Sequence, residues 1–301
     1  MSGEPRVLVL VAVHDGLPWL PAQLASLAAQ TDVDLQVLLG DDQSSDGSPE
    51  VLQRWAAQDT RFRLLPAPSA CGGAAANFFR LLAQAELERT DYLAFCDQDD
   101  QWYPERLIAG VRLLADSGAD LYSAATLARW PDGRQRRLSQ TTQQTRADFL
   151  FEGAGQGCSF LLTRRAALRI QQAVRQHADL LASVHYHDWA VYAAIRALEL
   201  EWVFDPQPHL EYRQHQGNDT GARASGGGVR RRLALIRSGW YRAQVEAIVR
   251  WVQVLRPGHP AVEGWQSCQS RLSRLPWVLR NGRRRGSDRL VQLLAVALGW
   301  L

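Results

Sequence analysis

The sequence predicts an α/β fold with a mainly parallel sheet flanked by helices, followed by a basic helical C-terminal extension. Short apolar runs alternate with segments of helical periodicity in the first part of the chain, which is typical of βαβ units. Three of these runs end in acidic residues, and parallel sheets bind ligands beyond the carboxyl ends of their strands. The extension is predicted by residues 228–301, where 14 arginines stand against three acids.

The expected strands and helices follow one another closely up to Gly118. Residues 7–13 form an uninterrupted apolar run, which is typical of a strand buried on both faces. Leucines with helical spacing come next, at Leu17, Leu20, Leu24 and Leu27. Further strands are expected at residues 34–42, 61–66 and 92–96, and further helices at residues 45–58, 77–88 and 103–118.

The alternation is less regular beyond Ser123. The polar residues 130–146 predict an exposed hairpin or loop, and residues 153–170 predict a Gly-rich turn, a strand and a helix. A helix is expected to begin near His187, and residues 224–228, "ASGGG", have the composition of a linker. From Val229 onward the pattern is helical and basic, with tryptophans spaced through it.

The composition limits the classes of protein that the chain can belong to. Its apolar fraction of 46% is enough for a sizeable core and too high for a disordered protein. Residues 1–227 hold 20 basic and 28 acidic residues, a net charge of about −8, which argues against a nucleic-acid binder despite the basic extension.

Two features predict the cellular compartment. The cysteines Cys71, Cys96, Cys158 and Cys268 are scattered without metal-site or redox spacing, so we expect reduced thiols in the cytoplasm. The apolar run at residues 7–13 is too short for the core of a signal peptide or for a membrane span.

The segment "CDQDD" places three carboxylates, Asp97, Asp99 and Asp100, directly after an expected buried strand. Crowded carboxylates repel one another, and burial strengthens that repulsion. A divalent metal, arginine side chains or water are the candidates to compensate for it. Asp-x-Asp supplies the oxygen ligands that Mg²⁺ or Mn²⁺ shares with substrate phosphates, so a metal site is expected here.

The other motifs leave alternatives open. Asp42, in "GDDQSSDGS", is either a helix cap or an acceptor for an N–H of a bound base. Asp188 is a helix cap, a zinc ligand together with His185 and His187, or a general base. Neither a Rossmann glycine motif nor a P-loop follows any expected strand, and no serine-hydrolase motif occurs.

In the order of its motifs, the chain resembles the family 2 nucleotide-sugar glycosyltransferases, which have the Rossmann-like GT-A fold. The resemblance spans roughly residues 5–222 and is carried by "DDQSSDG", "FCDQDDQWYPERL", "GQGCSFLLTRRAAL", "HDW" and "YRQHQGN". Several of these motifs are most similar to those of bacterial rhamnosyltransferases, which use dTDP-L-rhamnose. The resemblance implies a catalytic domain over residues 1–222 and leaves residues 229–301 as a basic, Trp-containing helical region.

The resemblance also implies roles for individual residues. Asp188 is implied as the catalytic base, and Asp99 and His215 as metal ligands. The implied donor-binding residues are Val13, Asp15, Asp42, Asp97, Gln98, Asp100 and Arg213. The implied acceptor region contains Trp102, Gly157, Cys158, His187 and Trp189. The chain departs from many relatives at Ala76, where a Lys or Arg is common before the position of Asn77.

The implied activity is a metal-dependent, inverting transfer of a sugar to a glycan or a lipid-linked glycan during synthesis of a cell-surface polysaccharide. The implied donor is dTDP-L-rhamnose, with a UDP-hexose as the alternative, and the implied cofactor is Mg²⁺ or Mn²⁺. A non-catalytic nucleotide-sugar-binding protein on the same fold is a further alternative. The basic extension is either a helical cap on the catalytic domain or a peripheral contact with an anionic membrane at its cytoplasmic face.

Overall fold

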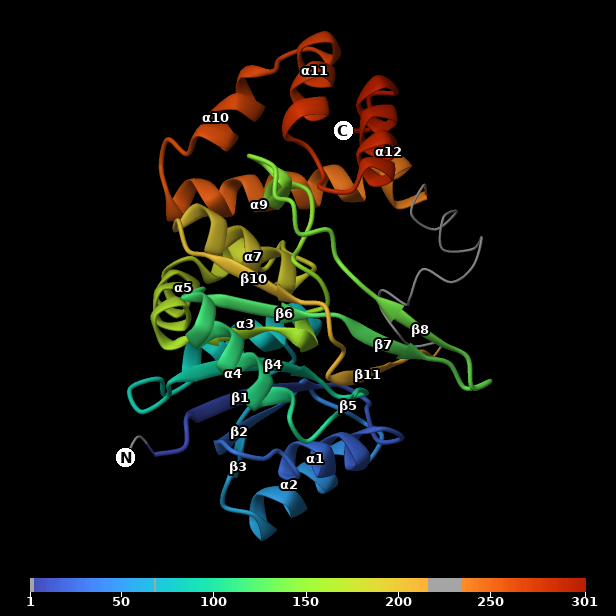
Figure 1. The fold of residues 1–301 in the computed structure, drawn as a ribbon. Coiled ribbons are helices and arrows are strands. Elements are labelled where there is room, and N and C mark those ends of the chain that lie inside the picture. Colours follow the sequence, from blue (N-terminus) through green and yellow to red (C-terminus); the bar gives the residue numbers. More distant parts are fainter. Residues whose placement is uncertain (1–2, 68, 216–233) are drawn as a thin grey trace.

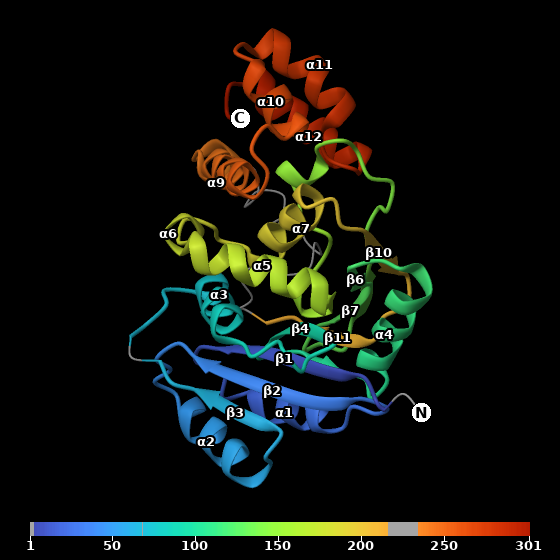
Figure 2. The same cartoon turned by 90° about the vertical axis from the view of Figure 1, so that its left-hand side faces the viewer.

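The computed structural model describes residues 3–67, 69–215 and 234–301 (Figure 1). The expected linker at residues 224–228 and the first residues of the basic extension lie outside the described residues. In the described part, an α/β body carries a group of helices from the C-terminal end of the chain, which Figures 1 and 2 show on one side of the sheet.

The central sheet has seven strands in the order β10-β6-β9-β4-β1-β2-β3. These are β1 (Arg6–Val13), β2 (Asp34–Asp41), β3 (Phe62–Leu65), β4 (Tyr92–Asp97), β6 (Leu121–Ala124), β9 (Leu161–Thr163) and β10 (Trp202–Asp205). All pairings are parallel except those of β9, which runs antiparallel to β4 and β6. The predicted mainly parallel sheet is therefore confirmed.

Helices cover both faces of the sheet. Successive side chains of a strand point to opposite sides, so each strand contributes to the packing on both faces. Val7, Val9 and Val11 of β1 pack with helices α1 (Leu20–Ala28), α2 (Ser48–Gln58) and α4 (Arg106–Ser117). Leu8 and Leu10 pack on the other face, with α3 (Ala74–Gln84), α5 (Arg164–Gln176) and α7 (His187–Ala197). The continuous apolar run of β1 is the consequence of this burial on two sides.

A second, four-stranded sheet has the order β5-β11-β7-β8. Its strands are β5 (Gln101–Trp102), β7 (Thr126–Arg129), β8 (Gln135–Leu138) and β11 (Leu210–Arg213). The antiparallel pair β7 and β8 forms a hairpin that begins earlier than the hairpin or loop expected at residues 130–146, so that only its turn and β8 fall in that range. This sheet brings β11, late in the chain, beside β5, which directly follows the acidic turn.

The helix expected at residues 77–88 lies earlier in the chain, at Ala74–Gln84. Gly73 directly precedes the helix with φ of 144°, a conformation that is open to glycine and outside the helical region. At the other end, the side-chain amide of Gln171 donates hydrogen bonds to the carbonyls of Leu82 and Ala85, both at 2.8 Å. These bonds satisfy carbonyls that the end of a helix leaves without partners.

The C-terminal helices continue the core of the α/β body. Helix α9 (Trp240–Leu255) packs on α7, and the buried indole of Trp251 donates a hydrogen bond to the carbonyl of Ala190 at 3.0 Å. Beyond it lie α10 (Pro260–Ser267), α11 (Arg271–Asn281) and α12 (Gly286–Ala297). In the described part of the chain, no helix combines the length and the apolar character that crossing a membrane requires.

A buried ionic network attaches α12 to the α/β body. Asp148, which is fully buried in the short 3-10 helix η1 (Asp148–Leu150), accepts hydrogen bonds from Arg196 at 2.6 Å, from Tyr192 at 2.7 Å and from Arg284 at 2.7 Å. The pKa of Tyr192 is raised by its burial and by the nearby charge of Asp148. Removing one partner from such a network is costly, because it leaves a buried charge less compensated.

We therefore predict that Arg284→Met lowers the free energy of unfolding by about 3 kcal/mol, since Asp148 then loses one of its two cationic partners. Urea denaturation of the purified protein measures this change. The neighbouring Arg285 is exposed, so Arg285→Met is the matched control and should change stability little. Equal stability of the two variants would show that the network contributes little.

Candidate active site

The acidic strand ends lie together at one edge of the central sheet, as the sequence predicts for parallel strands. In the register of the sheet, Val13 pairs with Asp41, and Ala12 pairs with Asp97. The backbone N–H of Asp42 also donates a hydrogen bond to the carbonyl of Val13 at 2.8 Å. Residues after β1, β2 and β4 therefore share one site.

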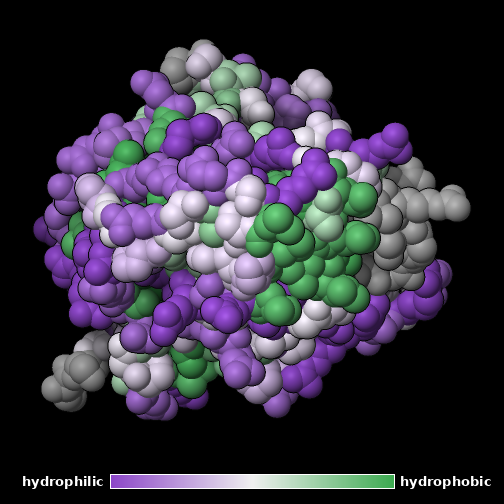
Figure 3. Space-filling view, turned by 90° about the horizontal axis from the view of Figure 1, so that it is seen from above, coloured by the Kyte–Doolittle hydropathy of each residue, from purple (hydrophilic) through white to green (hydrophobic). Residues whose placement is uncertain are grey.

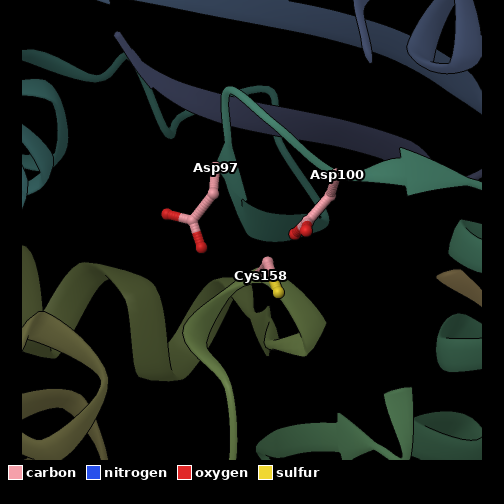
Figure 4. A group of neighbouring side chains, drawn as sticks. All are labelled: Asp97, Asp100 and Cys158. Carbon is pink, nitrogen blue, oxygen red and sulfur yellow. The ribbon is translucent and has the colours of Figure 1, made fainter. Parts of the chain in front are cut away.

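The turn after β4 concentrates the negative charge of this site. Asp100 is fully buried, and in the described part of the chain neither of its carboxylate oxygens has a hydrogen-bond partner. Burial and the neighbouring Asp99 and Asp97 raise the pKa of this carboxyl well above its usual range. Figure 4 shows Asp97 and Asp100 converging on Cys158, and one ligand atom of each lies within 4.8 Å of the others.

Asp99 and His215, the two expected metal ligands, lie in contact. The Nε2 of His215 is 2.8 Å from Oδ2 of Asp99, and both side chains are mostly buried. The imidazole also stacks on Trp19 with a centroid distance of 3.8 Å. A carboxylate and an imidazole in contact are a donor set that suits Mn²⁺ or a similar divalent ion, so the residues present fit the expected metal.

Two arginines lie close to the acidic turn. Arg213, at the end of β11, donates a hydrogen bond to Gln101 at 2.9 Å, and its charge acts on the buried Asp100. Arg106 is 1% exposed and donates to the carbonyls of Cys158 and Phe160 at 2.9 and 3.1 Å. Sequence reasoning missed Arg106, because its place at the exposed-looking start of an amphipathic helix gave no sign of burial.

Gln98 and Asp15 hold the loops of the site together. Gln98 accepts a hydrogen bond from the backbone N–H of His14 at 2.7 Å and donates one to the His14 carbonyl at 2.9 Å. The carboxylate of Asp15 accepts the N–H of Ser45 at 2.7 Å. A Cβ at Gly16 would lie 2.4 Å from Oε1 of Gln98, so this approach requires glycine. Both expected donor-binding side chains thus shape the edge of the site.

Asp42, the residue expected to contact the base, is buried at the end of β2. Its carboxylate accepts the N–H of Gly73 at 3.2 Å and the N–H of Cys71. One helical turn after Asn77, Arg80 donates to Oδ1 of Asn77 at 2.8 Å and to the carbonyl of Asp41 at 3.2 Å. Arg80 therefore brings a guanidinium to the strand end, although Ala76 stands where the resemblance implies a cation.

Asp188 lies in the first turn of α7, partly exposed, and its Oδ1 accepts the N–H of Trp189 at 2.6 Å. Gly157, in the 3-10 turn η2 (Gly157–Ser159), lies against it: an added Cβ would be 3.2 Å from the Cβ of Asp188. The next residue, Cys158, reaches the cluster of Asp97 and Asp100. One turn therefore connects the expected base to the acidic turn.

Four residues of the expected acceptor region are buried in the structure. The exposed fractions are 2% for Trp102, 0% for Cys158, 8% for His187 and 5% for Trp189, so none offers an acceptor much surface. Their aromatic side chains belong to the core or pack against it. Trp102 lies under the guanidinium of Arg106, and Trp189 donates to the carbonyl of Phe149.

His187 is held neutral by its surroundings. It packs against the rings of Phe78 and Phe95, and burial lowers its pKa to about 3. In the described part of the chain, the group of three or more His, Cys or carboxylate side chains whose ligand atoms lie within 4.8 Å of one another consists of Asp97, Asp100 and Cys158, and it does not include His187. The zinc alternative therefore receives no support there.

The comparisons with known proteins agree with this geometry. The sequence profile described as glycosyl transferase family 2 matches residues 8–173, which is more than half of the chain. The chain belongs to glycosyltransferase family 2. It is also 32% identical over 239 residues to the dTDP-rhamnosyl transferase RfbG of Shigella flexneri, a match that covers 79% of this chain and 83% of that protein.

Two solved structures show that the fold is that of the GT-A glycosyltransferases. TarS of S. aureus matches 91% of this chain and 47% of its own, with a TM-score of 0.53 and 13% identity. The mannosyltransferase PcManGT from Pyrobaculum calidifontis, in complex with GDP-Man and Mn²⁺, matches 99% of this chain and 87% of its own, with a TM-score of 0.53 and 15% identity. At these identities the likeness concerns the fold alone.

The place of Gly157 gives a prediction for catalysis. In Gly157→Ala the new methyl group would lie 2.4 Å from Nε2 of His187 and would displace the start of α7, including Asp188. We expect the rate constant of sugar transfer to fall about 100-fold, as for other small misplacements of reacting groups.

Gly286 is the matched control for this substitution, because an added Cβ there meets nothing within 4 Å. Steady-state transfer kinetics, together with thermal denaturation of both variants, measure the effect. Unchanged transfer by Gly157→Ala would show that the contact does not position Asp188.

The low pKa of His187 gives a prediction for stability. An unfolded histidine has a pKa of about 6.5, so between about pH 6.5 and 3 the unfolded chain binds a proton that the folded chain does not. The contribution of His187 is therefore fully present above about pH 6.5 and is lost as the pH falls, by up to about 1.4 kcal/mol per pH unit.

The variant His187→Phe, whose ring can pack with Phe78 and Phe95, should show a shallower loss of stability between pH 7 and 5 (roughly the start of this window). Urea denaturation at the two pH values measures the slopes. His185→Phe changes an exposed imidazole and is the control. Equal slopes for wild type and His187→Phe would contradict a buried, neutral His187.

Proposed function

We propose that this glycosyltransferase is a metal-dependent, inverting enzyme that transfers L-rhamnose from dTDP-L-rhamnose to a glycan or a lipid-linked glycan in the synthesis of a cell-surface polysaccharide. The observation that carries this proposal is the turn at Gly157, which places Asp188 next to the acidic turn after β4. A base for the acceptor and a metal site for the donor diphosphate are the two groups that the reaction needs.

Asp99 and His215 are the proposed metal ligands, with Mg²⁺ or Mn²⁺ as the ion. When bound, such an ion supplies positive charge to the diphosphate leaving group. The contact of Asp99 with His215 at 2.8 Å supports this assignment, because a carboxylate oxygen and an imidazole nitrogen that lie this close can both coordinate one ion. Arg213 is proposed to bind the diphosphate from the side of β11.

Asp188 is the proposed general base. Its carboxylate takes the proton of an acceptor hydroxyl while the oxygen attacks the anomeric carbon, and the bond from that carbon to the diphosphate oxygen breaks. The attack from the opposite side inverts the configuration at the anomeric carbon. A single carboxylate near the acceptor suffices for this reaction, whereas glycoside hydrolases need a pair that flanks the bond.

The donor is proposed to lie along the carboxyl ends of β1, β2 and β4. Asp42 is proposed to face the pyrimidine base, with Val13 and Asp15 lining the same pocket and with Asp97 and Asp100 near the ribose and diphosphate. The identity of 32% with a dTDP-rhamnosyl transferase supports the choice of dTDP-L-rhamnose. A UDP-hexose stays the alternative donor, and a TarS structure with bound UDP-GlcNAc is among the matching folds.

The proposed place of action is the cytoplasm, with peripheral contact at the inner face of the membrane and no nucleic-acid partner. Residues 1–222 are proposed as the catalytic domain, and residues 229–301 as the region that makes this contact. The scattered cysteines Cys71, Cys96, Cys158 and Cys268 are free thiols in the structure, in agreement with the expected reduced state.

A pair of substitutions tests the two proposed roles. With dTDP-L-rhamnose and Mn²⁺ in calorimetric titrations, Asp188→Asn should bind the donor as wild type does, while its transfer rate falls about 10²–10⁴-fold. Asp99→Asn should bind the donor more weakly than wild type in the presence of Mn²⁺. We expect EDTA to lower the donor affinity of the wild type and to leave that of Asp99→Asn unchanged.

The exposed Asp116 on α4 provides the matched control, as Asp116→Asn should leave both donor binding and transfer unchanged. Full wild-type activity in excess EDTA would refute metal dependence. Tighter binding of UDP-glucose than of dTDP-L-rhamnose would overturn the choice of donor, and normal transfer by Asp188→Asn would overturn the choice of base.

A further inference from the structure

The outer side of α11 and α12 exposes an unusual number of large apolar side chains. Among the described residues, nine large hydrophobic side chains are exposed; five of them lie on these two helices, and a sixth is the C-cap residue of α12. We call these six the leucine face: Leu272, Leu279, Leu290, Val291, Leu294 and Leu298. Leu272 is 84% exposed and Leu290 is 68% exposed, so no described part of the chain covers them. Figure 3 shows a contiguous hydrophobic area on this side of the molecule.

The spacing of these residues makes the apolar area a continuous face. Leu290 and Leu294 on α12 and its C-cap residue Leu298 follow one another at intervals of four, and Leu272 and Leu279 are seven apart on α11. These are the spacings of neighbours on one side of a helix. The inward side of α12 is already buried through Ala295 and Val296. The leucine face is therefore a second apolar side that packing within the described chain does not use.

The charges around this face are positive. Residues 270–301 contain seven arginines and a single acid, Asp288. Two of the arginines, partly buried Arg283 and buried Arg284, pair with Glu152 and Asp148, and the charge of Asp288 acts on Arg283. Arg271, Arg280 and Arg285 are exposed. The leucine face thus has cations beside it and no exposed acid in these helices.

This pattern of charge decides whether the leucine face contacts a second copy of the chain or a lipid surface. In a two-fold contact between copies of the chain, the same patch meets itself, so exposed arginines would face exposed arginines without acids to pair with. An anionic lipid surface supplies the opposite charge to the arginines and an apolar layer for the leucines.

We propose that the leucine face lies in the headgroup region of a membrane that contains anionic lipid, with its leucines inserted and Arg280 and Arg285 on lipid phosphates. The proposal deepens the peripheral contact named above, since it identifies the surface that makes it. It does not require the proposed donor, base or metal, and its test uses no turnover.

The test is co-sedimentation of the full-length protein with vesicles at low salt, where attraction between exposed charges is least screened. One set of vesicles contains equal parts of phosphatidylcholine and phosphatidylglycerol, and the other contains phosphatidylcholine alone. We expect binding to the first set, and weaker binding to the second. Deletion of residues 283–301 is unsuitable, because it would also take Arg284 from buried Asp148.

Point variants separate the two parts of the surface. The triple variant Leu272→Ser, Leu290→Ser, Leu294→Ser should weaken binding to the anionic vesicles at least about tenfold. Arg280→Gln and Arg285→Gln should each weaken it roughly fivefold. The matched controls are Leu168→Ser on α5, which is 39% exposed, and Arg54→Gln on α2, which is exposed. Both controls should bind as wild type does.

Three results would overturn the proposal. The first is failure of the wild type to sediment with anionic vesicles at low salt. The second is equal binding by the triple variant and the Leu168→Ser control. The third is a wild-type dimer in light scattering that the triple variant converts to a monomer, which would assign the leucine face to a second copy of the chain. Far-ultraviolet circular dichroism confirms that each variant is folded before the comparison.

Discussion

The structure of the site depends on the repulsion among the three carboxylates that follow β4. Asp97, Asp99 and Asp100 come within four positions of the chain, and Asp100 is fully buried. Each has a different environment. Asp99 contacts His215, and Asp97 is the last residue of β4. Asp100 lies near Arg213 and the buried Arg106. Carboxylates this close repel one another when they are ionised, and a bound cation would relieve that repulsion.

Much of the fold could be predicted from the sequence because it depends on local pattern. The apolar run of β1 and the alternation of strands and helices after it predict a parallel sheet. Because the carboxyl ends of parallel strands lie at one edge, Asp42 and Asp97 are expected to lie together there. A strand is expected within residues 153–170, where β9 lies, but its antiparallel direction is not, and of the second sheet only the hairpin is expected. Short strands joined by long irregular segments leave too little periodicity to show how they pair. The helix at Ala74–Gln84 was placed too late, because Gly73 gives no signal of its φ in the sequence.

The parts of the site that sequence reasoning missed are contacts between distant segments. Arg106 supports Cys158 from 52 positions away, and Asp148 binds Arg284 from 136 positions away, so no motif joins either pair. The expected acceptor region shows a second kind of long-range effect. His187 and Trp189 flank Asp188 in the chain, but α7 turns both side chains into the core and leaves the carboxylate partly exposed. An aromatic residue beside a reactive one in sequence can therefore hold it in place without touching the substrate.

The same long-range contacts connect the two proposed functions of the chain. Asp188 lies in the first turn of α7, and α9 packs along α7. Just before α12, Arg284 binds Asp148, which also binds Arg196 near the other end of α7. The helices that form the leucine face are therefore attached to α7, which carries the proposed base. If a membrane binds that face, the orientation of Asp188 relative to the lipid surface is set by packed helices and buried ion pairs. A lipid-linked acceptor would then be presented to the base in a limited range of positions, which lowers the entropic cost of bringing the two together.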